Sequence, residues 1–413
     1  MKKRILVVLD GIGDLPNPEL DNKTPLEAAN TPNLDFLALH GKTGLVQPLK
    51  QKIAPESDTA LMSLLGYNPL EYYTGRGPLE AMGADLKFKE GDLILRTNFA
   101  TFIDKKIIDR RAGRTLTTEE AIELGDAINK KVKLDYSFEF KPTIQHRGVL
   151  VIKGEFSDNI TNIDPGYKKE SYYSIAQKET ALKRCRALDG KNKTKLTADL
   201  VNEFVRQSYS VLKNHPINIE RSKKYLLPAN ILLLRDAGIT LPDLPAKKDW
   251  AAVVGMPLEI GLAKLSGMHI IKLNYPELIS QDIYKNLYAS LDEEIKTAKK
   301  ALKEGFFNTY FIHFKVTDVP GHDNKPLEKK KMIEILDKEF FSFIRKYDCH
   351  LIVTGDHSTP CIIKGHSPDP VPLLIYGQDM EMDNTTRFTE NECKNGSLGR
   401  IYSQDLLIQS DFE

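Results

Sequence analysis

The stretch Ile5-Leu-Val-Val-Leu9 is a continuous run of apolar residues near the start of the chain. A run without polar alternation is typical of a strand buried on both faces, as in a parallel sheet. Two similar runs, Tyr310-Phe-Ile-His-Phe314 and Leu351-Ile-Val353, occur late in the chain, and a helical pattern precedes each, at residues 280–304 and 327–347. We therefore predict an α/β fold with a mostly parallel sheet flanked by helices.

The middle of the chain differs in composition from both ends. Residues 85–245 are rich in Lys, Arg and Tyr, and helical stretches there mix with short strand-like runs. This segment leads into a Pro-rich stretch, residues 240–248, that is typical of a linker. A length of 413 residues suits two domains. We predict a discontinuous core, residues 1–84 and 246–413, interrupted by an α+β cap domain at residues 85–245.

The charge balance narrows the possible partners. The chain has 58 Lys plus Arg and 57 Asp plus Glu, a net charge of +1, which excludes a generally basic nucleic-acid binder and an acidic disordered chain. The predicted cap holds 29 basic against 22 acidic residues, and the predicted core holds 29 against 35. This division favours a core that binds cations and a cap that binds an anionic small molecule.

The four cysteines form no Cys-x-x-Cys pair, so we expect neither a zinc knuckle nor a disulfide framework. We interpret Cys185, Cys349, Cys361 and Cys393 as ordinary reduced thiols. The N-terminal apolar run ends at Asp10 without a small-residue cleavage site, and no run approaches membrane-spanning length. These features predict a cytoplasmic protein without a membrane partner.

Aspartates and histidines follow the apolar runs, where the carboxyl ends of parallel strands would bring them together. The candidate metal ligands are Asp10, Asp318, His322, Asp356, His357 and His366. Taken singly, each is more often a turn residue or a structural histidine. Asp and His are, however, the usual ligands of zinc and manganese, and Asp318 and His322 stand four residues apart across a Pro-Gly turn. The joint pattern predicts a divalent metal site.

Residues 54–66 have the pattern of a turn that enters a helix, with Ser57 at or near the N-cap. A serine in this place is commonly only a cap. A helix N-terminus also favours bound phosphate, and a metal beside the hydroxyl would make it a nucleophile at neutral pH. Ser57 is therefore the candidate nucleophile.

The cap contains a cluster of arginines whose guanidinium groups suit carboxylate or phosphate. Arg110, Arg111 and Arg114 fall within five residues, and Arg147 follows His146. His146 and Asp164 are candidates for proton transfer to and from hydroxyl groups of the substrate, because such transfer needs a positioned acid or base. The sequence leaves open which of the two is the base.

Many of these motifs occur together in one known family. The matching stretches are Leu9-Asp10-Gly-Ile-Gly-Asp14, Lys23-Thr-Pro-Leu-Glu-Ala28, Glu56-Ser57-Asp-Thr59, Gly75-Arg76-Gly77, Asn98-Phe-Ala-Thr101, Asp109-Arg-Arg-Ala-Gly-Arg114, His146-Arg147-Gly148, Asp164-Pro165, Lys315, Asp318 to Asp323, Thr354-Gly-Asp-His-Ser-Thr-Pro360 and Gly365-His366-Ser367. They resemble the alkaline phosphatase superfamily and, within it, the cofactor-independent (2,3-bisphosphoglycerate-independent) phosphoglycerate mutases of the archaeal type. The metal and nucleophile motifs belong to the superfamily, and the Arg-rich cap motifs narrow the resemblance to the mutases.

The resemblance implies an alkaline-phosphatase-like core with two divalent ions, which are manganese, zinc, cobalt or magnesium in different enzymes. One ion would be held by Asp318, His322 and His366, and the other by Asp10, Asp356 and His357, with Ser57 completing it. Ser57 would take the phosphoryl group from one hydroxyl of the glycerate and return it to the other. This phosphoserine route would interconvert 3-phosphoglycerate and 2-phosphoglycerate without 2,3-bisphosphoglycerate.

The implied substrate contacts come mainly from the cap. They are Arg76, Asn98, Arg110, Arg111, Arg114, Arg147 and Lys315. The resemblance implies a Lys-Gly pair after the linker, where this chain has Ile260-Gly261. Either this substrate contact is missing here, or Lys264 or Lys315 replaces it.

Two rival functions stay open at this stage. The first is a metal-dependent phosphotransferase or phosphatase that acts on another small phospho-metabolite, with a homoserine kinase-like activity as one example. The second is a non-catalytic protein that binds a phosphorylated ligand. The sequence does not define the oligomeric state.

Overall fold

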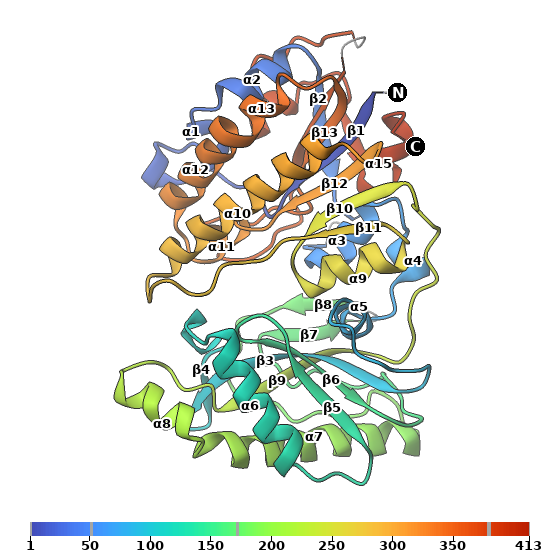
Figure 1. The fold of residues 1–413 in the computed structure, drawn as a ribbon, viewed down its shortest axis with the longest axis vertical. Coiled ribbons are helices and arrows are strands. Elements are labelled where there is room, and N and C mark those ends of the chain that lie inside the picture. The colour runs from blue at the N-terminus through green and yellow to red at the C-terminus, as the bar shows by residue number, and fades with distance from the viewer. Residues whose placement is uncertain (1, 50–52, 171–172, 378–380, 413) are drawn as a thin grey trace.

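The computed structural model describes residues 2–49, 53–170, 173–377 and 381–412. Figure 1 shows two sheet-based bodies, one above the other, with both ends of the chain in the upper one. Strands β1 and β2 and strands β10 to β15 belong to the upper body, and strands β3 to β9 to the lower one. The domain boundaries given above stay a prediction.

The upper body is built on an eight-stranded sheet. Its strands, in order across the sheet, are β11 (His269–Lys272), β10 (Trp250–Val254), β12 (Thr309–Phe314), β1 (Lys3–Leu9), β13 (Cys349–Thr354), β14 (Val371–Tyr376), β2 (Lys42–Gln47) and β15 (Arg400–Tyr402). Five of the seven neighbouring pairs are parallel, and β14 runs antiparallel to both of its neighbours. The three apolar runs lie in the neighbouring strands β12, β1 and β13, so the predicted mostly parallel sheet is confirmed.

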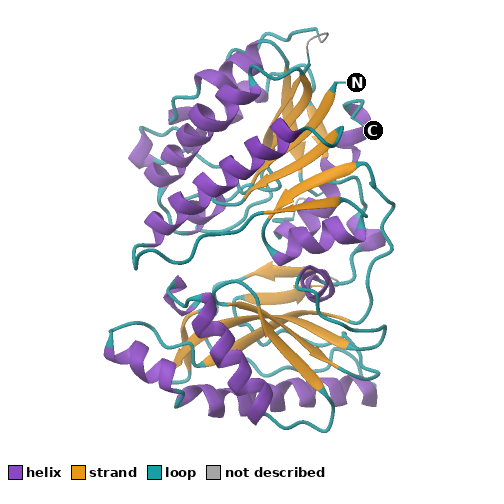
Figure 2. Ribbon diagram, in the orientation of Figure 1, coloured by secondary structure: helices purple, strands orange, loops and turns teal. Residues whose placement is uncertain are grey.

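Helices cover both faces of this sheet (Figure 2), which explains why its central strands are apolar on both sides. One face packs against α1 (Pro25–Ala28), α2 (Pro32–Leu39), α10 (Ile283–Glu304), α12 (Pro326–Ile335) and α13 (Ser342–Ile344). The other packs against α3 (Ser57–Leu64), α5 (Arg76–Gly83), α9 (Pro257–Leu265) and α15 (Leu406–Gln409). Three short helices, α4 (Pro69–Tyr72), α11 (Asp318–His322) and α14 (Glu390–Cys393), lie between these elements in the chain. The helix predicted at 327–347 is wrong as one regular helix, because a π-helical segment, Leu336–Phe341, separates α12 from α13.

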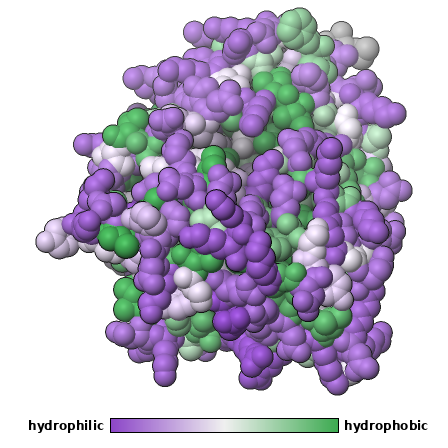
Figure 3. Space-filling view, turned by 60° about the horizontal axis from the view of Figure 1, so that its bottom comes forward, coloured by the Kyte–Doolittle hydropathy of each residue, from purple (hydrophilic) through white to green (hydrophobic). Residues whose placement is uncertain are grey.

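The lower body has an antiparallel sheet with its helices gathered on one face, which is an α+β arrangement. Its strands are β3 (Leu93–Ile103), β4 (Lys106–Asp109), β5 (Phe138–Pro142), β6 (Arg147–Ile152) and β9 (Ile231–Gly238), and a separate hairpin is formed by β7 (Tyr167–Glu170) and β8 (Tyr173–Ala176). Its helices are α6 (Thr118–Lys131), α7 (Asn192–Lys213) and α8 (Pro216–Lys223). Figure 3 shows that the surface that comes forward at this end is mostly hydrophilic, with scattered apolar residues.

Helix α5 lies at the seam between the two sheets, where it packs against α9 above and against β3 and β9 below. Two glycines permit the close approach of α5 and α9. A Cβ atom at Gly83 would lie 1.8 Å from the carbonyl oxygen of Pro257, and one at Gly261 would lie 1.9 Å from that of Leu79. This contact holds the C-terminal end of α5 against the first turns of α9.

Glu390, the first residue of α14, has a buried carboxyl, so we expect the stability of the protein to depend on pH. Burial raises the pKa of Glu390 to about 7, although Thr24 donates a hydrogen bond to its carboxylate at 2.7 Å. This pKa is higher than in the unfolded chain, so the folded state binds the proton more tightly. The stabilisation that the folded state gains from this proton is lost as the pH rises to the folded pKa. We expect the free energy of unfolding to fall between about pH 4.5, the ordinary pKa of a glutamate, and pH 7, and to fall less steeply in Glu390→Gln. Parallel pH profiles in urea unfolding of the two proteins would contradict this expectation.

Candidate active site

The predicted metal ligands converge at the carboxyl edge of the upper sheet. Asp10 directly follows β1, Asp356 and His357 follow β13, and Asp318 begins α11 after β12. These strands are neighbours and run parallel, so their ends meet at one edge. Asp318 and His322 lie on one helical turn rather than across the open Pro-Gly turn that the sequence predicted.

One group of ligands surrounds the His357 ring. Its Nε2 atom lies 3.3 Å from Asp10 Oδ1, 3.3 Å from Asp356 Oδ2 and 3.2 Å from Ser57 Oγ. Ser57 is the first residue of α3, and Glu56 is the N-cap, so the serine lies one position inside the helix. The four residues that the resemblance placed on one ion therefore lie together.

A second group surrounds Asp318. Its Oδ2 atom lies 3.3 Å from His322 Nε2, and its Oδ1 atom lies 3.7 Å from His366 Nε2. The two groups are neighbours, since the rings of His357 and His366 stack with centroids 3.8 Å apart. The candidate ligands thus form one continuous cluster.

The chemistry of this cluster fits divalent metal ions. Asp10 and Asp356 are fully buried. Burial, with other carboxylates close by, raises the pKa of Asp10 to about 8 and that of Asp356 to about 7. Carboxylates in such a place need a cation to ionise fully. Ligand atoms that lie within 4.8 Å of one another also form two sets, Asp318 with His357 and His366, and Asp10 with His313 and Asp356. His313 was not among the predicted ligands.

A cavity of about 80 Å³ lies between this cluster and the lower body. Eleven predicted site residues line it: Ser57, Arg76, Asn98, Arg110, Arg111, His146, Arg147, Lys315, Asp318, His322 and His366. A second cavity of about 130 Å³ shares several of these residues and also reaches Arg114. Asp164 lies outside both linings. The arginines of the lower body therefore face the acidic edge of the upper sheet.

The cavity wall also contains charged residues that the sequence analysis missed. Glu80 on α5 lies 2.7 Å from Arg76 Nε and 3.3 Å from Arg96 Nε. Arg96 stands two residues before Asn98 on β3, and the two-residue period of a strand would have placed both on one face. This periodicity was the signal that could have identified Arg96.

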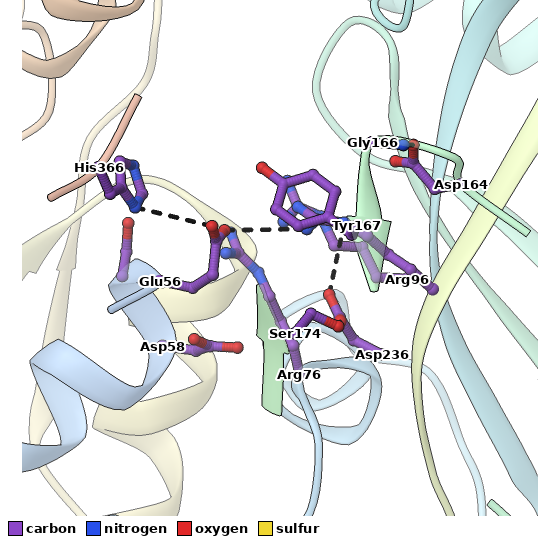
Figure 4. Close-up of polar contacts among 12 residues, drawn as sticks. Glu56, Asp58, Arg76, Arg96, Asp164, Gly166, Tyr167, Ser174, Asp236 and His366 are labelled. Atoms are coloured by element: carbon purple, nitrogen blue, oxygen red, sulfur yellow. Dashed lines mark hydrogen bonds and ion pairs between the residues drawn. The ribbon is translucent and has the colours of Figure 1, made fainter. Parts of the chain in front are cut away.

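Glu56 connects the metal cluster to the lower body (Figure 4). Its carboxylate lies 3.6 Å from His366 Nδ1 and 3.8 Å from Arg235 Nη1. The Arg235 guanidinium lies 3.5 Å above the centre of the Tyr167 ring. Burial opposes ionisation of Glu56, but His366 and Arg235 outweigh it and lower the pKa of this carboxyl. Arg235 carries no sequence motif that would have predicted its position.

His146 and Asp164, the two proton-transfer candidates, differ in their surroundings. Burial, together with Arg147 and Arg111, holds the pKa of His146 well below its usual range, so the imidazole is neutral at pH 7. Asp164 accepts hydrogen bonds from Arg110 Nε at 2.8 Å and from Arg110 Nη2 at 2.5 Å. Burial would raise the pKa of Asp164, but these hydrogen bonds outweigh it and lower the pKa. His146 lines the cavity, and its Nδ1 has no hydrogen-bond partner among the described residues.

The site contains a lysine, although Ile260 stands where the resemblance implied one. Ile260 lines a separate cavity of about 470 Å³. Lys264 donates hydrogen bonds to Met82 O at 3.1 Å and to Asp85 Oδ1 at 2.5 Å, at the C-terminal end of α5. Lys315 contacts Asp10 Oδ2 and lies 3.5 Å from Glu259 Oε1. Of the two candidates, Lys315 is the one in the cavity wall.

Comparison with known proteins places this geometry in a family. Residues 38–218 match the family model of 2,3-bisphosphoglycerate-independent phosphoglycerate mutase, and residues 251–409 match that of the metalloenzyme superfamily. The mutase of that name from Pyrococcus abyssi is 40% identical over 416 residues, which cover 98% of this chain and 96% of the relative. The chain belongs to the 2,3-bisphosphoglycerate-independent phosphoglycerate mutase family. The family resemblance seen in the sequence is confirmed. The mutase from Thermococcus gammatolerans is 41% identical over 421 residues, with the same coverage of 98% and 96%.

Two solved structures agree with this assignment. A protein from Pyrococcus horikoshii has a TM-score of 0.74 at 34% identity, over 99% of this chain and 96% of its own. The cofactor-independent phosphoglycerate mutase from Thermoplasma acidophilum has a TM-score of 0.57 at 33% identity, over 99% of both chains. None of the helices in the described part of the chain has the length and apolar character needed to cross a membrane.

Proposed function

We propose that this chain is an isomerase that interconverts 3-phosphoglycerate and 2-phosphoglycerate, with Ser57 as the phosphoryl carrier. The observation that carries the proposal is the place of Ser57, which begins α3, lies 3.2 Å from His357 and lines the arginine-rich cavity. The free N–H groups of a helix terminus stabilise a phosphoryl group. The Ser57 oxygen would bond to phosphorus as the bond to one substrate oxygen breaks, and the second half-reaction would return the phosphoryl group to the other hydroxyl.

The metal ligands in this proposal divide into the two groups that the family resemblance implies, and the close approach of their ligand atoms in one cluster supports the assignment. Asp318, His322 and His366 would hold one divalent ion, and Asp10, Asp356, His357 and Ser57 would hold the other. When bound, such ions neutralise charge on the oxygens around phosphorus and lower the proton affinity of a serine hydroxyl. Manganese, zinc, cobalt and magnesium are the candidates, and no 2,3-bisphosphoglycerate is needed.

The basic groups of the cavity would bind the carboxylate and phosphate of a phosphoglycerate. Arg76, Arg111, Arg147 and Lys315 are at least partly buried in its wall, where water screens their charge less than at the surface. The ion pair between Arg114 Nη1 and Asp323 Oδ2, at 2.6 Å, joins the lower body to the upper one beside His322. A cavity between the two bodies suits a mutase, because the glycerate must stay bound and water must be excluded while the phosphoryl group is on Ser57. A cytoplasmic location remains a prediction.

His146 is the group that we assign to proton transfer with the substrate hydroxyls. A neutral imidazole in the cavity wall can accept a proton, whereas Asp164 is bound to Arg110. His146→Gln should lower kcat roughly 10²- to 10³-fold, within the range for loss of a general base. Asp164→Asn should instead raise KM more than it lowers kcat, because it frees Arg110. Steady-state kinetics of both variants decide the roles, and an unchanged kcat in His146→Gln would remove it from catalysis.

Removal of metal tests the proposed site as a whole. Exhaustive chelation should abolish activity, and addition of manganese, cobalt, zinc or magnesium should restore it, since the carboxylates cannot neutralise charge at phosphorus by themselves. Activity and metal content are measured on the same protein sample, with the metal content determined by mass spectrometry. Full turnover by protein shown to be free of metal would defeat the assignment.

A further inference from the structure

A histidine in the middle of the sheet has no role in the site as described so far. His313 lies near the end of β12, beside Val8 in the register with β1, and its side chain is 3% exposed. Phe311 packs in the hydrophobic cluster on the α3 and α9 side of the sheet, and the alternation along the strand places His313 on that same side. An imidazole in such an apolar place is costly unless both of its nitrogens find partners.

One ring nitrogen of His313 faces a buried carboxylate. Its Nδ1 atom lies 3.3 Å from Glu259 Oε1, and Glu259 is 2% exposed in the first turn of α9. Burial opposes ionisation of Glu259, but Lys315 and His313 outweigh it and lower the pKa of the carboxyl to about 2. A proton on Nδ1, facing this carboxylate, would leave the lone pair on Nε2.

The other nitrogen points to the predicted ligands. His313 Nε2 is buried without a hydrogen-bond partner among the described residues and lies 3.8 Å from Asp10 Oδ2. Asp356 Oδ2 is likewise buried without a hydrogen bond, and ligand atoms of Asp10, His313 and Asp356 lie within 4.8 Å of one another. Ligand atoms of three buried residues therefore lie close enough together to share one ion.

We propose that His313 is a further metal ligand through Nε2, on the ion held by Asp10 and Asp356, and that Glu259 orients its ring. This inference rests on the proposed function, because it concerns the same metal centre. The carboxylate–histidine–metal arrangement is the usual way in which a protein fixes the tautomer and direction of a ligating imidazole. Lys315 contacts both Asp10 and Glu259, so in the metal-free state its ammonium balances the charge that the ion would balance.

Cobalt titration of the metal-free protein tests the inference without using activity. Wild type should take up two equivalents of Co²⁺. In His313→Gln one equivalent should bind as in wild type, while the other binds at least about tenfold more weakly and with an altered visible absorption band. Glu259→Gln should weaken the same equivalent by about 10- to 100-fold, as expected for loss of an orienting carboxylate.

His269→Gln is the matched control, because His269 is exposed on β11 and stacks on Phe307 away from the cluster. It should titrate as wild type does. If folded His313→Gln binds two equivalents with wild-type affinity and absorption, this inference is overturned, while the two-metal proposal stands. If His313→Gln does not fold, Glu259→Gln decides, and wild-type binding there overturns it. Wild type that binds fewer than two ions would instead overturn the two-metal proposal, and this inference with it.

Discussion

The Ser57→Ala variant is expected to lose at least about 10⁴-fold in kcat, because Ser57 is the only serine or threonine among the described residues that line the cavity. Ser57 Oγ is 3.2 Å from His357 Nε2, and the side chain is nearly buried at the first turn of α3. The change removes one oxygen and leaves the aspartates and histidines of the cluster in place. Metal content should therefore stay close to that of wild type.

Ser63→Ala is the matched control, since Ser63 is buried on the same helix but does not line the cavity. It should keep wild-type kcat. Incubation with 3-phosphoglycerate that is radiolabelled in the phosphate should label wild type and Ser63→Ala, and leave Ser57→Ala unlabelled. Retained turnover or labelling in Ser57→Ala would remove Ser57 from its role.

The second large effect concerns a lysine with no solvent exposure. Lys329 Nζ lies 2.8 Å from Asp14 Oδ2, 3.2 Å from Gly13 O and 3.1 Å from Thr359 O, so α12 is tied to the loops that follow β1 and β13. Lys329→Met removes the ammonium and leaves Asp14 buried without its cation. We expect a loss of about 3–5 kcal/mol in the free energy of unfolding, as for other broken buried pairs.

Lys330→Met provides the comparison on the next residue of the same helix. Lys330 pairs with Glu334 at 2.7 Å, but both side chains are about 30% exposed, so the change should cost at most about 1 kcal/mol. Urea unfolding of the metal-free proteins measures both effects. Equal stability of the two variants would contradict the account of Lys329.

The sequence was enough to predict the sheet, because its central strands are apolar on both faces and only a doubly covered sheet buries such runs. The ligands Asp10, Asp356 and His357 could be predicted for a related reason. They follow such runs, and parallel strands bring their carboxyl ends to one edge. The family motifs then supplied the residues of the lower body.

The residues that the sequence analysis missed are polar side chains whose partners are distant in the chain. His313 lies inside an apolar run, so the sequence pattern indicated only a strand residue. Lys329 stood among three consecutive lysines, which have the pattern of a solvated helix face. Glu259 and Arg235 have no local signal, and only the packing of α9 and β9 against the site shows their place. Tertiary contacts, not local patterns, decide which charged residues are buried.

Phosphoryl transfer itself is the most direct test of the central claim. Metal-loaded wild type is incubated with 3-phosphoglycerate alone, without 2,3-bisphosphoglycerate, and the products are followed by ³¹P NMR. We predict that 2-phosphoglycerate forms and approaches equilibrium with 3-phosphoglycerate while little inorganic phosphate is released. Release of inorganic phosphate without 2-phosphoglycerate would contradict the mutase and indicate a phosphatase on the same scaffold.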